Sequence, residues 1–266
     1  MSELEITIRD RVQTIRFNRP EKKNALKSDM YAAMTEALLN GDASADVTSH
    51  LFIGSGGVFT AGNDIAEFLE RSKGGAALGM PVAGFIRGLA TVKKPMIAAV
   101  DGLAVGIGTT LLFHCDLVYA TPSASLRTPF LDLGLVPEAG SSLLAPQRMG
   151  YARAFELLVL GEPFSAERAR EAGIVNAIVP AGELEATARK AAARLASKAP
   201  EALALSRRLM RGDPSAIVAR VDEEVKIFGA RLSSPEAREA FAAFMEKRKP
   251  DFTKTGSSAN EPNQGM

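Results

Sequence analysis

The stretch "KKPMIAAVDGLAVGIGTTLLFHCDLVYA", residues 93–120, decides the fold of this chain. An apolar run, "MIAAVDG" (96–102), leads through a glycine-rich turn into a helical pattern and then into a second strand, "DLVYA" (116–120). Two buried strands separated by a helical segment, "GIGTTLLFHC", are typical of α/β proteins. The stretch therefore predicts an α/β core.

The same alternation continues towards the amino end. The segments "ELEITIRD" and "RVQTIRFNRP" alternate polar and apolar residues at period two, which predicts an antiparallel pair of strands. Residues 28–40 have helical spacing, with Ser28 as the expected cap and Gly41 as the expected stop. A short strand is expected at 49–55 and a helix at 81–92.

Towards the carboxyl end the strand pattern fades. Short extended pieces are expected within 125–136, and the last strand, "NAIVP", at 176–180. Residues 181–248 predict three or four consecutive helices, and prolines mark three of their starts: Pro200, Pro214 and Pro235. The final stretch, "TKTGSSANEPNQGM", is polar and irregular, so we expect it to be disordered.

Composition excludes several function classes. The chain has 266 residues, 46% of them hydrophobic, and a net charge of +1, which gives no global field for nucleic acid or an anionic membrane. The charged amino end does not resemble a signal peptide, and the longest nearly apolar run, 102–113, is too short to span a bilayer. We therefore expect a soluble, cytoplasmic protein of one large domain, or a core with a small appendage.

The chain has few of the residues that bind metals or form disulfides. Cys115 is the only cysteine, so no internal disulfide can form. The only histidines are His50 and His114, and no pair of ligands has metal-site spacing. We expect no metal, and we expect His114 to be a core or helix-end residue.

The turn in "DGLAVGIG" raises the question of a dinucleotide site. After Gly106 and Gly108, the fingerprint needs a third glycine at position 111, where this chain has Leu111. The acidic residue expected about twenty positions later is also missing, since Asp116 comes too early. A nicotinamide site is therefore not expected.

A second use of the same geometry remains. A glycine-rich turn that opens a helix leaves N–H groups free to bind an anion, and "TAGND" (60–64) is another such turn. Each turn alone is explained by simple strand-to-helix geometry. Together, two turns that each offer one N–H would form an oxyanion hole.

The third feature is a lone acid in "GLVPEAGSS" (134–142). Glu138 lies between a proline and a glycine in apolar surroundings. It could mark the start of a helix capped by Ser141 or Ser142, or it could be a catalytic base. A serine hydrolase is not expected, because the chain has no GxSxG elbow.

Four motifs in order resemble the enoyl-CoA hydratase/isomerase, or crotonase, superfamily. They are "RFNRPEKKNAL" (16–26), "GSGGVFTAGNDIAEF" (54–68), residues 93–120 and "TPFLDLGLVPEAGSSLLAPQRMG" (128–150), and "GEPFSAERAREAGIVNAIV" (161–179) continues the likeness. The resemblance implies an α/β spiral of ββα units, a helical trimerisation region and acyl-CoA thioester substrates. It divides the chain into a spiral core at 1–198, a helical oligomerisation region at 199–250 and a tail at 251–266.

The resemblance also implies roles for individual residues. The two oxyanion N–H groups should come from Asn63 and Ile107; hydratases usually have glycine at the latter position, so its side chain is expected to narrow the acyl channel. Lys22, Lys23 and Lys27 offer positive charge for the phosphates of coenzyme A, or form a solvated surface cluster. The substrate and coenzyme A are expected to contact a wider set: Lys23, Asn24, Ala25, Leu26, Ala61, Gly62, Asp64, Ile65, Gly106, Gly108, Thr110 and Phe130.

The departures from the family pattern narrow the chemistry. Hydratases that resemble this chain use two glutamates, at the positions of Thr110 and Phe130. Both acids are missing, so the usual hydration pair is not expected. The chain is instead similar to Δ3,Δ2-enoyl-CoA isomerases of the peroxisomal type, whose catalytic glutamate falls at Glu138. One base suffices there, because it takes a proton from C2 and returns it at C4.

Alternatives stay open. Another one-acid reaction, such as isomerisation of an epoxide-CoA, weak hydration, or binding of acyl-CoA without conversion would also fit the resemblance. No cofactor is expected beyond the coenzyme A of the substrate. A homotrimer or a pair of trimers is expected, with the apolar face of 235–248 packing on the core or on another subunit, and with Phe244 and Lys247 near a neighbouring subunit's coenzyme A. The expected setting is fatty-acid β-oxidation.

Overall fold

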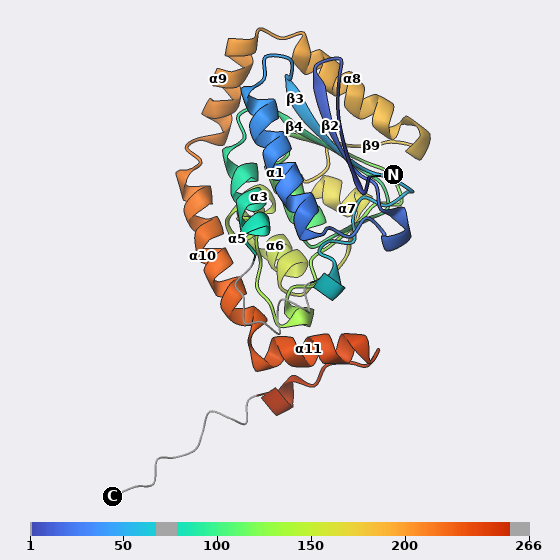
Figure 1. The fold of residues 1–266 in the computed structure, drawn as a ribbon, viewed down its shortest axis with the longest axis vertical. Coiled ribbons are helices and arrows are strands. Elements are labelled where there is room, and N and C mark those ends of the chain that lie inside the picture. The colour runs from blue at the N-terminus through green and yellow to red at the C-terminus, as the bar shows by residue number, and fades with distance from the viewer. Residues whose placement is uncertain (1, 68–78, 256–266) are drawn as a thin grey trace, which may run out of the picture.

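A six-stranded sheet forms the centre of the computed structural model, which describes residues 2–67 and 79–255 (Figure 1). Its strands lie in the order β1-β2-β3-β4-β6-β9. The first two pair antiparallel, as predicted, and all the others pair parallel. The bounds are β1 Leu4–Arg9, β2 Val12–Phe17, β3 Ser49–Gly54, β4 Met96–Val100, β6 Leu117–Ala120 and β9 Ala177–Ile178.

Both faces of this sheet are covered, which explains why its central strands are apolar throughout. Helix α1 (Ser28–Ala43) and helix α3 (Met80–Thr91) cover one face, where Phe52 and Ala98 belong to the main core. Helix α8 (Leu184–Ala196) covers the other face, onto which the alternate strand residues point. That smaller cluster contains Val12, Leu51, Ile53, Ile97, Ala99, Leu184, Ala188 and Ala192.

A second sheet has three strands, β5 (Leu103–Val105), β7 (Ser125–Arg127) and β8 (Phe164–Ser165). Both glycine turns adjoin its strand β5, because Thr60 pairs with Ala104 and Gly106 follows Val105. β5 pairs parallel with β7, and β7 pairs antiparallel with β8. The chain passes from the first sheet to the second at residues 101–102, between β4 and β5, and Gly106 directly follows β5.

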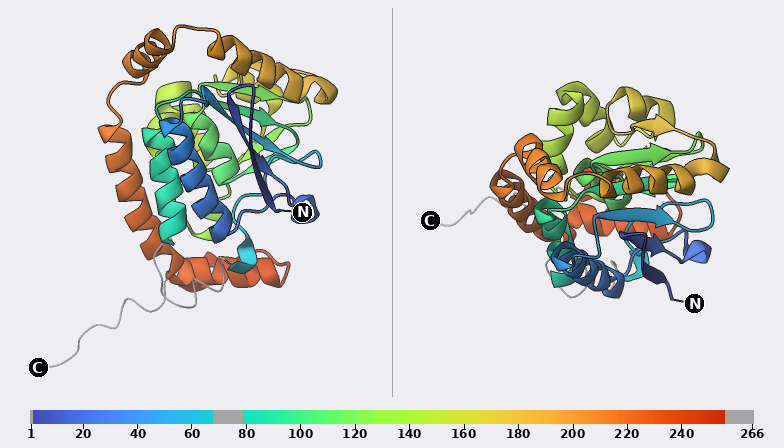
Figure 2. Two further views of the ribbon diagram at one scale, coloured as in Figure 1. Left: turned by 45° about the horizontal axis from the view of Figure 1, so that its top comes forward. Right: turned by 90° about the horizontal axis from the view of Figure 1, so that it is seen from above.

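The carboxyl-terminal part is helical, as predicted. Helix α9 (Pro200–Arg211) lies at one corner, α10 (Ser215–Leu232) runs beside α3, and α11 (Pro235–Met245) crosses the end of the molecule (Figure 2). The remaining helices are short: α4 Ile107–Thr110, α5 Ser141–Met149, α6 Tyr151–Leu158 and α7 Ala166–Glu171. Turns of 3-10 helix occupy Pro20–Lys22, Leu111–His114, Leu131–Leu133, Ala181–Glu183 and Phe252–Thr255.

The first helix differs from expectation at both ends. Ser28 is its first residue, not its cap; Lys27 occupies the cap position, and the Ser28 N–H donates to Oε2 of Glu67 at 2.9 Å. Gly41 does not stop it, since the helix runs on to Ala43. A Cβ at Gly41 would lie 2.6 Å from Oε1 of Gln13 and 2.7 Å from Cε1 of His50, so this glycine allows close packing of the helix on the sheet.

Two further expectations need correction. Residues 131–133 form a 3-10 turn and are not extended, and the helix expected after Gly106 divides into α4 and a 3-10 turn. In the expected tail, Phe252–Thr255 forms a 3-10 turn, while 256–266 lies outside the described residues. Within 2–67 and 79–255, every helix is too short or too polar to cross a lipid bilayer.

Candidate active site

The first glycine turn, at 60–64, is fixed against the second sheet. The Thr60 N–H donates to the Leu103 carbonyl, and the Val105 N–H donates to the Thr60 carbonyl, both at 3.0 Å. Gly62 has φ of +85°, and a Cβ there would lie 2.8 Å from the Val105 carbonyl oxygen. Only glycine combines this backbone conformation with so close an approach. The two turns are therefore held side by side.

The second turn opens helix α4. Gly106 has φ of 56° and ψ of −119°, a conformation that only glycine adopts readily, and open space lies where a Cβ would be. A Cβ at Gly108 would lie 2.5 Å from Cγ2 of Thr60, so this residue packs on the first turn. Among the hydrogen bonds of the described residues, none uses the N–H of Asn63 or of Ile107. Both amides are thus free to donate to a ligand.

Glu138 is buried, with 4% of its surface exposed. Thr110 Oγ1 donates to Glu138 Oε1 at 2.5 Å, and no hydrogen bond to Oε2 is found within residues 2–67 and 79–255. Burial raises the pKa of Glu138 to about 8; the Thr110 hydrogen bond opposes this rise and the charge of Glu224 adds to it.

Tyr31 bonds to the first turn and lies within electrostatic reach of Glu138. Its hydroxyl donates to Oδ1 of Asn63 at 2.5 Å, and the residue is 1% exposed. Burial first, and then the charges of Glu138 and Glu67, raise the pKa of Tyr31 well above its usual value. Tyr31 therefore lies within electrostatic reach of the acid while it orients the Asn63 side chain. Its place on the apolar face of the predicted helix gave no signal beyond the rule that a buried tyrosine hydroxyl needs a partner.

The turn after Glu138 is held by distant residues. Ala139 and Gly140 have φ of 57° and 70°. The His114 side chain, 1% exposed, bonds through Nε2 to the Ala139 carbonyl at 2.7 Å; because a carbonyl only accepts, Nε2 carries the hydrogen. The prediction that His114 is a core or helix-end residue is confirmed.

The expected serine cap on α5 is wrong. Gly140 occupies the cap position, and no side chain of its own caps the helix. Instead, the Glu224 carboxylate on α10 accepts hydrogen bonds from the N–H groups of Gly140 and Ser142. A helix does start here, as the simpler interpretation of this stretch required. However, its free N–H groups donate to the Glu224 side chain and not to the Glu138 side chain.

The loop expected to hold coenzyme A is built around Asn24. Lys23 and Asn24 have φ of 51° and 56°. The Asn24 side-chain amide donates to the carbonyls of Ser55 and Val58, its Oδ1 accepts from the Arg19 N–H, and the residue is 0% exposed. Asn24 thus shapes the loop from inside, and its expected contact with coenzyme A stays a prediction.

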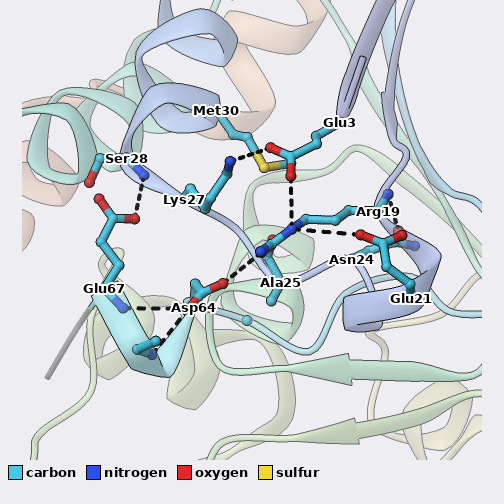
Figure 3. Close-up of polar contacts among 12 residues, drawn as sticks. Glu3, Arg19, Glu21, Asn24, Ala25, Lys27, Ser28, Met30, Asp64 and Glu67 are labelled. Carbon is cyan, nitrogen blue, oxygen red and sulfur yellow. Dashed lines mark hydrogen bonds and ion pairs between the residues drawn. The ribbon is translucent and has the colours of Figure 1, made fainter. Parts of the chain in front are cut away.

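Arg19 ties this loop to the first glycine turn (Figure 3). Its Nη1 donates to Oδ2 of Asp64 at 2.6 Å and to the Ala25 carbonyl at 3.3 Å. Asp64 also accepts from the N–H groups of Ala66 and Glu67, and its pairing with Arg19 holds its pKa below the usual range. The carboxylate of Asp64 is therefore engaged within the protein.

The three lysines of the loop differ in their surroundings. The Lys27 ammonium forms an ion pair with the Glu3 carboxylate (Figure 3) and lies 3.9 Å from the Asp29 carboxylate. Lys22 and Lys23 are exposed beside it. Lys22 and Lys23 are therefore the more accessible cations of this loop, and a lysine contact with phosphates stays a prediction.

Some of the other residues expected to contact the substrate are buried, and others are partly exposed. Leu26 is 2% exposed and its backbone pairs with Gly62 and Asp64, so its side chain belongs to the core. Ile107 and Phe130 are also core residues, at 2% and 5% exposure. The residues that keep partial exposure around the first turn are Ala25, Ala61, Asn63, Asp64 and Ile65.

The arrangement defines an acid–amide site: two free main-chain N–H groups on adjoining turns, and one buried carboxylate that is bonded to Thr110 of the second turn's helix and lies within electrostatic reach of Tyr31, which bonds to the first turn. Comparison with known proteins identifies its class. The family model for enoyl-CoA hydratase/isomerase matches residues 7–255. The chain belongs to this family.

Relatives within the family are similar over nearly the whole chain. The 1,2-epoxyphenylacetyl-CoA isomerase of Escherichia coli is 35% identical, over 91% of this chain and 95% of its own length. Enoyl-CoA delta isomerase 2 of Rattus norvegicus is also 35% identical over 91% of this chain, which spans 63% of that longer protein. A crystal structure of an enoyl-CoA hydratase/isomerase from Pseudoalteromonas atlantica superimposes with a TM-score of 0.88 at 38% identity, covering 94% of this chain and 100% of that one. The predicted α/β crotonase fold is confirmed.

Proposed function

We propose that this enzyme shifts the double bond of a 3-enoyl-CoA to give a 2-enoyl-CoA. The observation that supports this most strongly is the buried carboxylate of Glu138 bonded to Thr110, with Thr110 and Phe130 at the two positions where similar hydratases have glutamates. Adding water needs a water to be activated and a proton to be delivered to carbon. Moving a double bond needs only one group that takes and returns a proton.

In the proposed mechanism, the N–H groups of Asn63 and Ile107 hold the thioester oxygen. Glu138, ionised, removes a proton from C2, and the negative charge moves to the thioester oxygen of the dienolate. Glu138 then returns the proton at C4. Loss of one such oxyanion donor typically costs roughly 3 kcal/mol, and a positioned base adds roughly 10²–10⁴ in rate.

Several features of the setting belong to the same proposal. The acyl-CoA would lie along the loop at 19–27 and the turn at 60–65, with Lys22 and Lys23 as the exposed cations nearest its phosphates. Gly106 has open space on the side where a Cβ would be, which leaves room for a ligand beside the Ile107 amide. We further propose a cytoplasmic enzyme of fatty-acid β-oxidation.

The test is replacement of Glu138 by Gln. The variant keeps the size of the side chain and its bond to Thr110 but cannot carry a proton, so kcat on a 3-enoyl-CoA should fall by at least about 10². The control is Glu223→Gln, an exposed acid on α10, which should leave kcat unchanged. Glu138→Gln activity within tenfold of the parent would end the proposal.

A second candidate is favoured by one observation, the similarity to the E. coli 1,2-epoxyphenylacetyl-CoA isomerase. Opening an epoxide and rearranging it also needs one acid and an oxyanion site. Product analysis separates the candidates: incubation with 3-enoyl-CoA, with 2-enoyl-CoA and with an aromatic epoxide-CoA should give product only from the first. A 3-hydroxy product from 2-enoyl-CoA would indicate hydration, and binding without conversion of any substrate would indicate an acyl-CoA-binding protein.

A further inference from the structure

Helix α10 reaches the turn that carries Glu138 through one buried acid. Glu224 is 5% exposed. Its Oε2 accepts from the Gly140 N–H at 2.5 Å, and its Oε1 accepts from the Ser142 N–H at 3.0 Å and from Ser142 Oγ at 2.5 Å. Each oxygen thus faces at least one N–H donor that belongs to the turn or to the start of α5.

This geometry suits an ionised carboxylate. Both oxygens accept, and the start of a helix stabilises a negative charge. Burial raises the pKa of Glu224, while the hydrogen bonds from Ser142 and Gly140 and the charge of Arg220 oppose the rise. Arg220 lies on the same helix, donates to Ser142 Oγ at 3.3 Å and pairs with Glu223.

We propose that Glu224 is a positioning residue for Glu138: it fixes the 138–142 turn through the Gly140 and Ser142 N–H groups and adds a second negative charge near the proposed catalytic base. The backbone bonds support the first half. The Ser141 N–H donates to the Glu138 carbonyl, and Glu224 holds the residues immediately before and after Ser141. Because Ala139 and Gly140 both have positive φ, this turn depends on such partners to keep its shape.

The second half follows from charge. Four elements bring polar or titratable groups near Glu138. They are Tyr31 from α1, Thr110 from α4, His114 from the 3-10 turn Leu111–His114, and Glu224 from α10. Of these, Tyr31 and His114 are held neutral by burial, since the Tyr31 pKa is raised and the His114 pKa is lowered to about 4. The Glu224 charge therefore makes the Glu138 carboxylate a stronger base.

The role of Glu138 as base rests on the proposed function, but the coupling to Glu224 can be measured without substrate. Three variants are compared: Glu224→Gln, which keeps size and loses charge; Glu224→Ala, which loses both; and Glu223→Gln, which removes an acid from the adjacent, exposed position. In ligand-free protein, ¹³C NMR follows the titration of the Glu138 carboxyl, assigned by its disappearance in Glu138→Gln. In the enzyme assay, kcat and KM are measured across pH.

Glu224→Gln should move the Glu138 titration and the acid limb of kcat/KM to lower pH, and Glu223→Gln should move neither. Glu224→Ala should lower kcat by about tenfold or more, with KM changed by less than about twofold, because a loosened turn misplaces the acid while the coenzyme A loop is untouched. Because Glu224→Gln retains an acceptor oxygen and its volume, it keeps the charge effect testable if Glu224→Ala fails to fold.

An unchanged Glu138 titration in Glu224→Gln would overturn the charge role. A Glu224→Ala variant that folds and keeps full kcat would overturn the positioning role. A shifted titration in a protein that isomerises no 3-enoyl-CoA would support the coupling and instead contradict the proposed function.

Discussion

At the scale of single residues, the pKa of Glu138 links stability to pH. The carboxyl titrates at about 8 in the folded protein and at 4.5 when unperturbed, so the folded state binds more protons between these values. The free energy of unfolding therefore falls as pH rises through this window. Glu138→Gln has no such proton to lose.

The Tm of Glu138→Gln minus that of the parent protein should be near zero at pH 4.5, grow more positive as pH rises towards 8, and level off above it. Scanning calorimetry at a series of pH values measures this difference. A difference that does not depend on pH would show that the carboxyl is not shifted upward.

A second residue-scale prediction concerns the Tyr31 hydroxyl, which bonds to the Asn63 side chain. Tyr31→Phe should lower kcat by roughly 2- to 10-fold with little change in KM, because a single hydrogen bond of about 1 kcal/mol orients the residue that supplies the first amide. Tyr119→Phe, a tyrosine in β6 away from the site, is the control. Equal kcat in both variants would show that the Tyr31 hydroxyl is not needed to orient Asn63.

Some residues of the candidate site could be predicted from the sequence, and others could not. Glu138, Asn63 and Ile107 lie in short motifs, where a proline or glycine neighbour marks the turn. Tyr31 and Glu224 act on partners 32 and 84 positions away in the chain, so no local pattern marks them. Asn24 belongs to a motif, but burial of its side chain could not be seen from the letters alone.

At the scale of elements, the close approach of the two glycine turns depends on position 62 being a glycine, which has no Cβ. Gly62→Ala would force φ of +85° on an alanine and place its Cβ 2.8 Å from the Val105 carbonyl. We expect a loss of about 1–3 kcal/mol in the free energy of unfolding and a fall in kcat, since the two amides would be pushed apart.

Gly84 provides the matched control, because it lies inside α3 with nothing within 4 Å of a built Cβ. Gly84→Ala should raise the free energy of unfolding by up to about 1 kcal/mol and leave kcat unchanged. Urea unfolding and steady-state kinetics on both variants test the pair. If Gly62→Ala is as stable and as active as Gly84→Ala, the close approach of the turns is not needed.

Element types were predicted better than element ends. Period-two alternation marked β1 and β2, and prolines marked the starts of α9, α10 and α11. The helix after Gly106 was predicted as one piece because a short, mostly apolar run does not show where α geometry changes to 3-10. Gly41 was misread because a glycine required for helix–sheet contact looks the same in sequence as one that ends a helix.

At the scale of the whole molecule, α9 has no buried residue, although it is apolar on one side. Leu205, Leu209 and Met210 are 42%, 80% and 88% exposed. On α11, the apolar face divides: Phe241 is buried, whereas Phe244 is 52% exposed. We propose that the helical region packs against other copies of the chain in a homotrimer or a pair of trimers, with Phe244 and Lys247 near a neighbour's coenzyme A.

Sedimentation equilibrium at micromolar concentration should give three or six times the chain mass of 28.2 kDa. Leu209→Glu with Met210→Glu should shift the protein to smaller species, because two charges would be buried at the interface. Leu39→Glu, at a 61% exposed position on α1, is the control. A parent protein that sediments as a monomer would contradict the proposal.

The most direct test of the whole account is a crystal structure with a non-reactive acyl-CoA. The account predicts the thioester oxygen within about 2.7–3.1 Å of the Asn63 and Ile107 nitrogens together, with Oε2 of Glu138 facing C2 and C4. A thioester oxygen bound by neither amide, or a Glu138 carboxyl turned away from both carbons, would contradict it.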